Sequence, residues 1–189
     1  MRPSPVRERI LAAADEFFYA EGIRAVSADR IIAAAEVSKV TFYRHFPTKD
    51  DLVLAYLDGR SAVERGVVEH LRSTHADDAC AALVAIAQAV ADTSCASGFR
   101  GCPFINAAAE YADPGHPVRR AIVAHRDWFA GVLTDLIAEL GVVDSPQVVD
   151  RLLMLRDGAM VGGYLGSSSA PRAETLIGAG RAVIDAARR

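Results

Sequence analysis

The window from Ser38 to Lys49 holds the side chains whose types and spacing best suit a chemical task, the binding of DNA. It carries three cations, Lys39, Arg44 and Lys49, and no acidic residue. The 189-residue chain as a whole has a net charge of −3, whereas proteins that coat nucleic acid indiscriminately are basic overall. The sequence therefore predicts that the chain contacts DNA through this short window and not through its whole surface.

Ser38 is expected to be the N-cap of a short helix from Lys39 to Phe46. This helix is predicted to have an inward and an outward face. Phe42 and Phe46 lie one turn apart, so both are expected in the core. On the outward face, Arg and Thr can read base edges, a Val methyl can touch thymine, and a Tyr hydroxyl can donate to a phosphate. The alternative is an ordinary solvated helix face. The residues expected to contact DNA from this helix are Lys39, Val40, Thr41, Tyr43, Arg44 and His45.

A second short helix is predicted directly before this one. Ser27 precedes an apolar run that includes Ile31 and Ile32, so it is expected to be the N-cap, and we include it among the candidate DNA-binding residues. Two short helices joined by a turn around Glu36 form the helix-turn-helix pattern, whose second helix enters the major groove.

Lys49 opens the helix that follows. Pro47 ends the preceding run, and Thr48 with Asp51 three residues later forms a pattern like a capping box. A cation in the first turn faces the positive end of the helix dipole, at a cost of about 0.3–1 kcal/mol. Because a phosphate bound at this helix start would reverse that cost, Lys49 is expected to contact the DNA backbone. The alternative is a lysine that is simply solvated.

The elements that position this window are predicted to be helices throughout, in an all-α protein. The hydrophobic fraction is 51%, and abundant alanine favours close-packed helices. Proline and glycine divide the chain into about nine helices. These are expected from Val6 to Gly22, after Ser27, at 39–46, from Lys49 onwards, and at 77–93, 103–111, 117–140, 146–165 and 171–188.

The run from Val37 to Leu52 resembles the signature of TetR/AcrR-family transcriptional regulators. The resemblance extends back through Phe17, Gly22 and Ile31, and the segment from Gly101 to Tyr111 resembles one found in a subset of the family. It implies an Ω-shaped homodimer without enzymatic activity. In such a dimer the first three helices bind a palindromic operator in double-stranded DNA, and the remainder answers an unknown small-molecule effector.

The same resemblance implies phosphate contacts for Tyr43 and Lys49. It also implies two domains, a helix-turn-helix DNA-binding domain at 1–48 and a C-terminal helical bundle at 49–189 for ligand binding and dimerisation. The sequence departs from the family pattern at Glu36, where glycine is usual, and at Val40, where many relatives have glycine. The turn is expected to need a left-handed backbone at Glu36, and this conformation costs a residue other than glycine about 1 kcal/mol.

The C-terminal part offers two sets of candidate residues. An effector pocket is expected to be mostly apolar with a few converging polar groups, although aromatic residues at helical spacing are more often core. The pocket candidates are Phe104, Tyr111, His125, Trp128 and Tyr164. A palindrome is read by two recognition helices about one DNA turn apart, so the protein is expected to be a dimer. The alternative for the residues of the expected dimer face is an intramolecular core. These residues are Leu152, Leu155, Met160, Leu176, Gly180 and Val183.

Three other functions compete with this interpretation. A thiol-sensing regulator could use Cys95 and Cys102, although buried inert cysteine is more common. A helical enzyme is a second alternative, but the sequence contains none of the familiar catalytic motifs. An architectural DNA protein is a third, but it would not need so large a C-terminal core. The three cysteines favour a reducing cytoplasm. No apolar run is long enough to span a membrane, and we expect no cofactor or metal.

Overall fold

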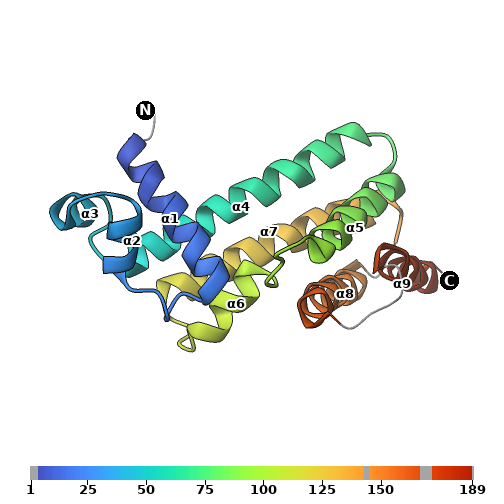
Figure 1. Ribbon diagram of the computed structural model, residues 1–189. Helices are drawn as coiled ribbons and strands as arrows, with labels where there is room; N and C mark the ends of the chain where they lie inside the picture. The colour runs from blue at the N-terminus through green and yellow to red at the C-terminus, as the bar shows by residue number, and fades with distance from the viewer. Residues whose placement is uncertain (1–3, 143–144, 167–171, 189) are drawn as a thin grey trace. The chain divides into compact units, whose positions relative to one another are not determined.

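The structure, a computed structural model, describes residues 4–142, 145–166 and 172–188 (Figure 1). These residues form nine helices and no strand, which confirms the predicted all-α fold. The helices are α1 (Pro5–Glu21), α2 (Ala28–Ala34), α3 (Lys39–His45), α4 (Lys49–Thr74), α5 (Ala79–Cys95), α6 (Pro103–Glu110), α7 (Pro117–Glu139), α8 (Ser145–Leu165) and α9 (Arg172–Ala187).

The chain divides into two compact units that each draw on separate stretches of sequence. The first unit contains Met1–Val63 and Pro103–Ala124, and the second contains Glu64–Cys102 and His125–Arg189. The helices α4 and α7 therefore contribute to both units. The first unit also includes α6, so a helix that begins at residue 103 is grouped with the three N-terminal helices, an association that a single boundary after residue 48 does not express.

Side-chain caps set the boundaries of the short helices in the first unit. The Ser27 hydroxyl accepts a hydrogen bond from the Arg30 N–H at 3.3 Å, and Ser38 accepts one from the Thr41 N–H at 3.1 Å. Thr48 and Asp51 cap each other reciprocally, with backbone-to-side-chain distances of 2.9 and 3.1 Å. All three predicted helix starts are confirmed, because a cap depends only on residues within one turn.

The core of the first unit is built from the inner faces of its helices. Phe42 and Phe46 are 0% and 2% exposed, as predicted, and their rings lie 6.3 Å apart. The Arg7 guanidinium covers the Phe46 ring at 5.0 Å, and the Arg9 side chain donates to the Ala35 carbonyl. The helix α1 therefore fixes α3 and the end of α2 from behind, so the outer face of α3 is held rigidly.

In the second unit, α5, α8 and α9 pack against one another. A glycine permits the closest approach, because a Cβ placed on Gly163 of α8 would lie 2.8 Å from the Cβ of Ser94 on α5. The remainder of the core joins α4, α5, α7 and α8. Its buried residues include Val68, Ile86, Phe129, Leu133, Val149 and Leu153.

Candidate functional site

The outer face of α3 is an exposed surface that mixes apolar, aromatic and cationic side chains. Val40 is 81% exposed and Tyr43 is 40% exposed, although both flank the fully buried Phe42. Arg44 is also exposed. A large apolar side chain left in water on a rigid, capped helix is suited to contact with another molecule. The sequence-based division of α3 into a core face and an outer face is confirmed.

The remaining candidate residues of α3 lie at the edges of this face. Thr41 is half-buried, and its hydroxyl is 2.8 Å from that of Ser38. The Lys39 ammonium lies 3.2 Å from the Asp29 carboxylate of α2, with both side chains largely exposed. Such a surface ion pair is weak, so Lys39 can exchange it for a phosphate. His45 is half-buried at the end of the helix.

Lys49 occupies a different environment from the one expected for a solvated lysine. Its ammonium donates to the Ile23 carbonyl at 2.6 Å and lies 5.9 Å from the centre of the Phe18 ring. Burial lowers the pKa of Lys49 below its ordinary value, opposed by the negative charges of Glu110 and Asp50. The side chain thus ties the start of α4 to the connection between α1 and α2, and two of its three N–H donors remain for other acceptors.

Glu36 gives the turn of the helix-turn-helix its shape. Its φ of 51° is the only positive value at a non-glycine position in the described residues. The Glu36 N–H donates to the Ala33 carbonyl and the Val37 N–H donates to the Ile32 carbonyl, both at 3.2 Å. These two bonds form a Schellman motif, in which glycine is the usual residue at the left-handed position. The predicted left-handed backbone at Glu36 is confirmed.

The carboxylate of Glu110, at the end of α6, braces the connection between α1 and α2. It accepts hydrogen bonds from the N–H groups of Ile23 and Arg24 at 2.8 and 2.6 Å. Gly22 lies beneath it with a φ of 94°, and a Cβ at Gly22 would lie 3.3 Å from the Glu110 carboxylate. This contact was not predicted, because no local pattern in the sequence joins residues so far apart in the chain.

A second cluster fastens α6 and α7 to the start of α4 within the same unit. The Tyr111 hydroxyl donates to the Asp50 carboxylate at 3.0 Å, and the His116 ring lies 3.3 Å from the same group. Burial, followed by the hydrogen bond to Asp50, raises the pKa of Tyr111 above its ordinary value. The helix-turn-helix is therefore supported from α6 as well as from α1.

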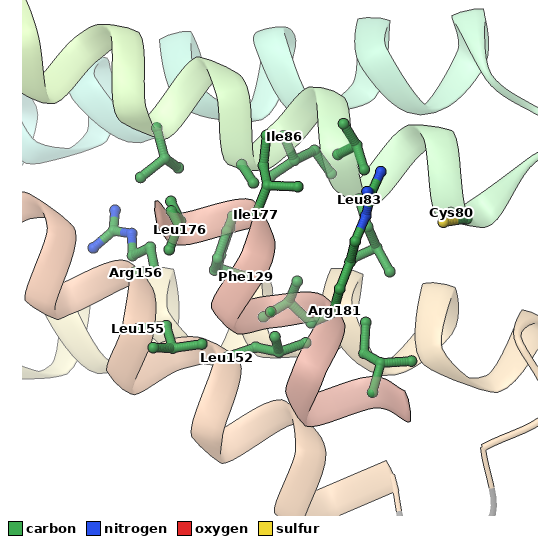
Figure 2. Close-up of a pocket in the computed structure, with 16 residues that line it drawn as sticks. Cys80, Leu83, Ile86, Phe129, Leu152, Leu155, Arg156, Leu176, Ile177 and Arg181 are labelled. Carbon is green, nitrogen blue, oxygen red and sulfur yellow. The ribbon is translucent and has the colours of Figure 1, made fainter. Parts of the chain in front are cut away.

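The second unit contains a half-open apolar pocket between α5, α7, α8 and α9, with a cavity volume of about 80 Å³ (Figure 2). Its walls are formed mainly by aliphatic residues of α5, α8 and α9, together with Phe129 of α7. Two cations, Arg156 of α8 and Arg181 of α9, also line it. This is the arrangement of apolar walls with few polar groups that is typical of a small-molecule site.

Arg156 is the centre of a buried polar cluster beside this pocket. It is 9% exposed, and its guanidinium contacts Glu64 at 3.1 Å, Asp157 at 3.3 Å and the Cys102 sulfur at 3.5 Å. Burial acts to lower the pKa of Arg156, but Cys102 and the acids Glu64 and Asp157 raise it above its ordinary value, so the side chain stays charged. His125 contacts Glu64 at 3.3 Å.

The five predicted pocket residues lie in several separate places. Phe104 is buried in the first unit, where Tyr111 bonds Asp50 as described above. In the second unit, Trp128 lines a separate groove between α4 and α7, with the Arg65 guanidinium 4.4 Å from its ring centre. Tyr164 is 51% exposed on α8. His125 is buried against Glu64, and none of the five lines the apolar pocket.

The predicted dimer residues are turned largely toward their own chain. Met160 is buried, Val183 packs against the core, and the other four line the apolar pocket: Leu152, Leu155, Leu176 and Gly180. Sequence analysis missed an outer stripe of α8, where Met154, Val161 and Leu165 are exposed. Their spacing of seven and four residues was the available signal, because it places them on one helical face.

In the part of the chain that the structure describes, we find neither a disulfide nor a cluster of metal-ligating side chains. The three cysteines are free thiols, with Cys80 and Cys95 exposed and Cys102 buried. No cluster of three or more metal-ligating side chains occurs there. None of the described helices combines the length and apolar character needed to cross a membrane.

Comparisons with known proteins identify the relatives of this chain. Residues 10–56 match the sequence model of the bacterial regulatory proteins of the tetR family. The chain is 43% identical to SCO4454, a TetR-family transcriptional regulator from Streptomyces coelicolor, with a TM-score of 0.91 over 97% of this chain and 96% of that one. No curated protein matches the sequence significantly.

More distant solved structures share the fold. The putative regulator sav143 from Streptomyces avermitilis is 24% identical, with a TM-score of 0.82 over 98% of this chain and 99% of that one. A TetR regulator from Legionella pneumophila is 20% identical, with a TM-score of 0.76 over 98% of both chains. The likeness therefore extends over nearly the whole length of each protein.

Proposed function

The chain belongs to the TetR family of transcriptional regulators, and we propose that it is a ligand-responsive repressor that binds a palindromic operator as a homodimer. The observation that carries the proposal is the outer face of α3, where Val40, Tyr43 and Arg44 are exposed on a capped helix. We assign DNA binding to residues 1–48, ligand binding and dimerisation to residues 49–189, and action in the cytoplasm.

The chemistry of the α3 face supports contacts with both bases and phosphates. Arg44 and Thr41 can donate to base edges, and Val40 can contact a thymine methyl group. Tyr43 and Lys39 can donate to phosphates on either side, which fixes the register of the helix in the groove. Lys49 can reach a phosphate as a second acceptor beside the Ile23 carbonyl, and the phosphate charge would offset the burial that lowers the pKa of this ammonium.

The outer stripe of α8 supports a homodimer. Met154 and Leu165 are 62% and 67% exposed, with Val161 between them. The neighbouring α9 exposes small residues at Gly178 and Ala182, where a partner helix can approach closely. A two-fold interface of this kind places two copies of α3 symmetrically, as a palindrome requires. Replacing both Met154 and Leu165 by Arg should give a folded monomer with weakened operator binding.

Regulation follows from thermodynamic linkage between the two sites. An effector that binds the DNA-incompetent arrangement more tightly must weaken DNA binding by the same factor. The half-open apolar pocket of the second unit is the proposed effector site, and α4 is the proposed connection because it contributes to both compact units.

The first experiment is selection of binding sites from genomic fragments, followed by gel-shift titration of the best site. Wild type is compared with the Tyr43→Ala/Lys49→Ala double variant, and Arg188→Ala, which removes one positive charge near the C-terminus, is the matched control. The double variant should bind at least tenfold more weakly, with a smaller dependence on salt because fewer counterions are released.

Two further measurements make the result specific to DNA contact. Tyr43→Phe keeps the ring and removes the hydroxyl, so a loss of affinity without a change in thermal stability isolates the phosphate contact. Circular dichroism must show that the double variant is folded, because Lys49 also bonds the Ile23 carbonyl. If wild type selects no sequence, or if the folded double variant binds as tightly as wild type, the proposal is wrong.

A further inference from the structure

We propose that the effector is a linear, largely apolar molecule with one uncharged carbonyl-type acceptor, which Arg156 binds through its Nε–H at one end of the pocket between α5, α8 and α9. This inference rests on the proposed effector role of the second unit and names the chemical class of the effector. Three observations support it: the elongated shape of the pocket, the Arg156 Nε–H that has no acceptor, and the balance of charge around the Arg156 guanidinium.

The pocket is elongated and apolar along its length. On α5 the lining extends from Cys80 to Val90, a distance of about 15 Å by the rise of a helix. Leu152 of α8 and Ile177 of α9 close the sides. In the view of Figure 2, Arg156 lies at the left end of this row and Cys80 at the right. Such a slot matches an extended aliphatic body with a polar group at or near one end.

Arg156 has one donor that the protein leaves without an acceptor. Its Nη atoms contact Glu64, Asp157 and Cys102, whereas its Nε is buried and has no hydrogen-bond partner among the described residues. A buried N–H without a partner destabilises a protein, and native structures leave few of them. Arg119 and Arg172 bury such an Nε too, but of the three only Arg156 lines the pocket, where the acceptor of an entering molecule would satisfy it.

The charge around Arg156 favours an acceptor that is not an anion. Glu64 and Asp157 contact the guanidinium, and Asp157 also pairs with Arg126 at 2.6 Å. At the Arg156 end of the pocket, two carboxylates therefore already balance two guanidinium groups, whereas Arg181, the other cation of the lining, lies nearer to Cys80 in the view of Figure 2. A ligand carboxylate would bring a third negative charge into an apolar pocket beside them, which is costly. A ketone, ester or amide oxygen supplies the hydrogen bond without that cost.

The size of the cavity connects binding to regulation. A volume of about 80 Å³ is smaller than the roughly 300–1,000 Å³ of sites that hold drug-sized ligands. A chain-like molecule must therefore separate α5 from α8 and α9 as it enters. Because α8 and α9 carry the proposed dimer face, an effector of this shape would act on the arrangement of the two subunits.

The test measures the binding of three probes of similar length by isothermal titration calorimetry. Methyl octanoate carries a neutral carbonyl, octanoate carries an anion, and 1-chlorononane has neither. We compare wild type with Arg156→Lys, which keeps the positive charge for Glu64 but has no Nε–H, and with Ala87→Phe, which fills the slot from α5. Arg151→Lys, a conservative change on the exposed side of α8, is the control.

Wild type and Arg151→Lys should bind methyl octanoate about tenfold or more tightly than either other probe. 1-Chlorononane offers no carbonyl acceptor to the Nε–H, and octanoate brings a third negative charge into the apolar pocket. Arg156→Lys should bind methyl octanoate no more tightly than 1-chlorononane, and Ala87→Phe should bind none of the three. The inference is wrong if wild type prefers octanoate, if it binds the three equally or not at all, or if Arg156→Lys keeps the preference for the ester.

Gel shifts of the same variants without any probe separate this inference from the proposed function. Operator binding by wild type with no binding of methyl octanoate would overturn the effector class alone. Ester binding through Arg156 in a protein that selects no DNA would overturn the repressor proposal and leave the ligand class standing.

Discussion

The two compact units of this protein place their charged side chains in opposite ways. In the first unit, Lys39 and Arg44 lie in water on the outer face of α3, over a core of phenylalanines. In the second, Arg156 and His125 lie inside the unit beside an apolar pocket. The first arrangement suits a large charged partner that arrives from solvent, and the second suits a small apolar partner that must be enclosed.

The two units should also respond differently to the removal of a charged side chain. Removing a charge from the α3 face should alter DNA affinity with little effect on stability, because surface ion pairs contribute little. Removing a charge from the Arg156 cluster should alter stability first, because its half-buried partners lose a charge-assisted hydrogen bond that water replaces only in part. Four predictions test this difference, beginning with the largest expected effect.

Arg156→Met should destabilise the second unit by up to about 3 kcal/mol, because it leaves the half-buried Glu64 carboxylate without its guanidinium. The measurement is urea denaturation followed by circular dichroism. The double variant Arg156→Met/Glu64→Gln should recover much of the loss, since it removes both charges. Equal losses in the single and double variants would show that the ion pair does not carry the effect.

Gly163→Ala should destabilise the protein by about 1–3 kcal/mol, because the added Cβ must push α8 away from Ser94 of α5. The matched control is Gly131→Ala on α7, where a Cβ would meet nothing within 4 Å. That control should be stabilising by about 0.5–1 kcal/mol, as alanine is favoured over glycine in a helix. Thermal unfolding of both variants distinguishes close packing from helix propensity.

Glu36→Gly should stabilise the first unit by up to about 1 kcal/mol, because glycine adopts the left-handed conformation without the strain of a Cβ. Glu36→Ala keeps the Cβ and should give no comparable gain. The two variants are compared by chemical denaturation. A gain with alanine equal to that with glycine would attribute the effect to the loss of the glutamate charge.

Acid should weaken the second unit through Glu64. Burial acts to raise the pKa of Glu64, but the hydrogen bond to His125 and the charge of Arg156 hold it below its ordinary value. A lowered folded-state pKa adds stability above the unfolded value, about 4.3, and that stability is lost as the pH falls through the folded-state pKa. Unfolding free energies between pH 7 and pH 3 should show this loss in wild type and a smaller one in Glu64→Gln.

The sequence by itself determined the features that depend on residues within one or two helical turns. The caps at Ser27, Ser38 and Thr48, the two faces of α3 and the left-handed turn at Glu36 were all predicted and confirmed. Hydrogen bonds between neighbours along the chain and the 3.6-residue period govern these features, so they can be read without knowledge of the remaining fold.

Only the tertiary structure decided which distant residues meet. Glu110 reaches Ile23 across 87 residues, and Arg156 reaches Glu64 across 92. It also decided that Leu152, Leu155 and Leu176 line a pocket of their own chain, whereas Met154 and Leu165 face outward. An apolar stripe on a helix specifies that something must cover it, but the helix that does so is selected by the packing of the whole unit.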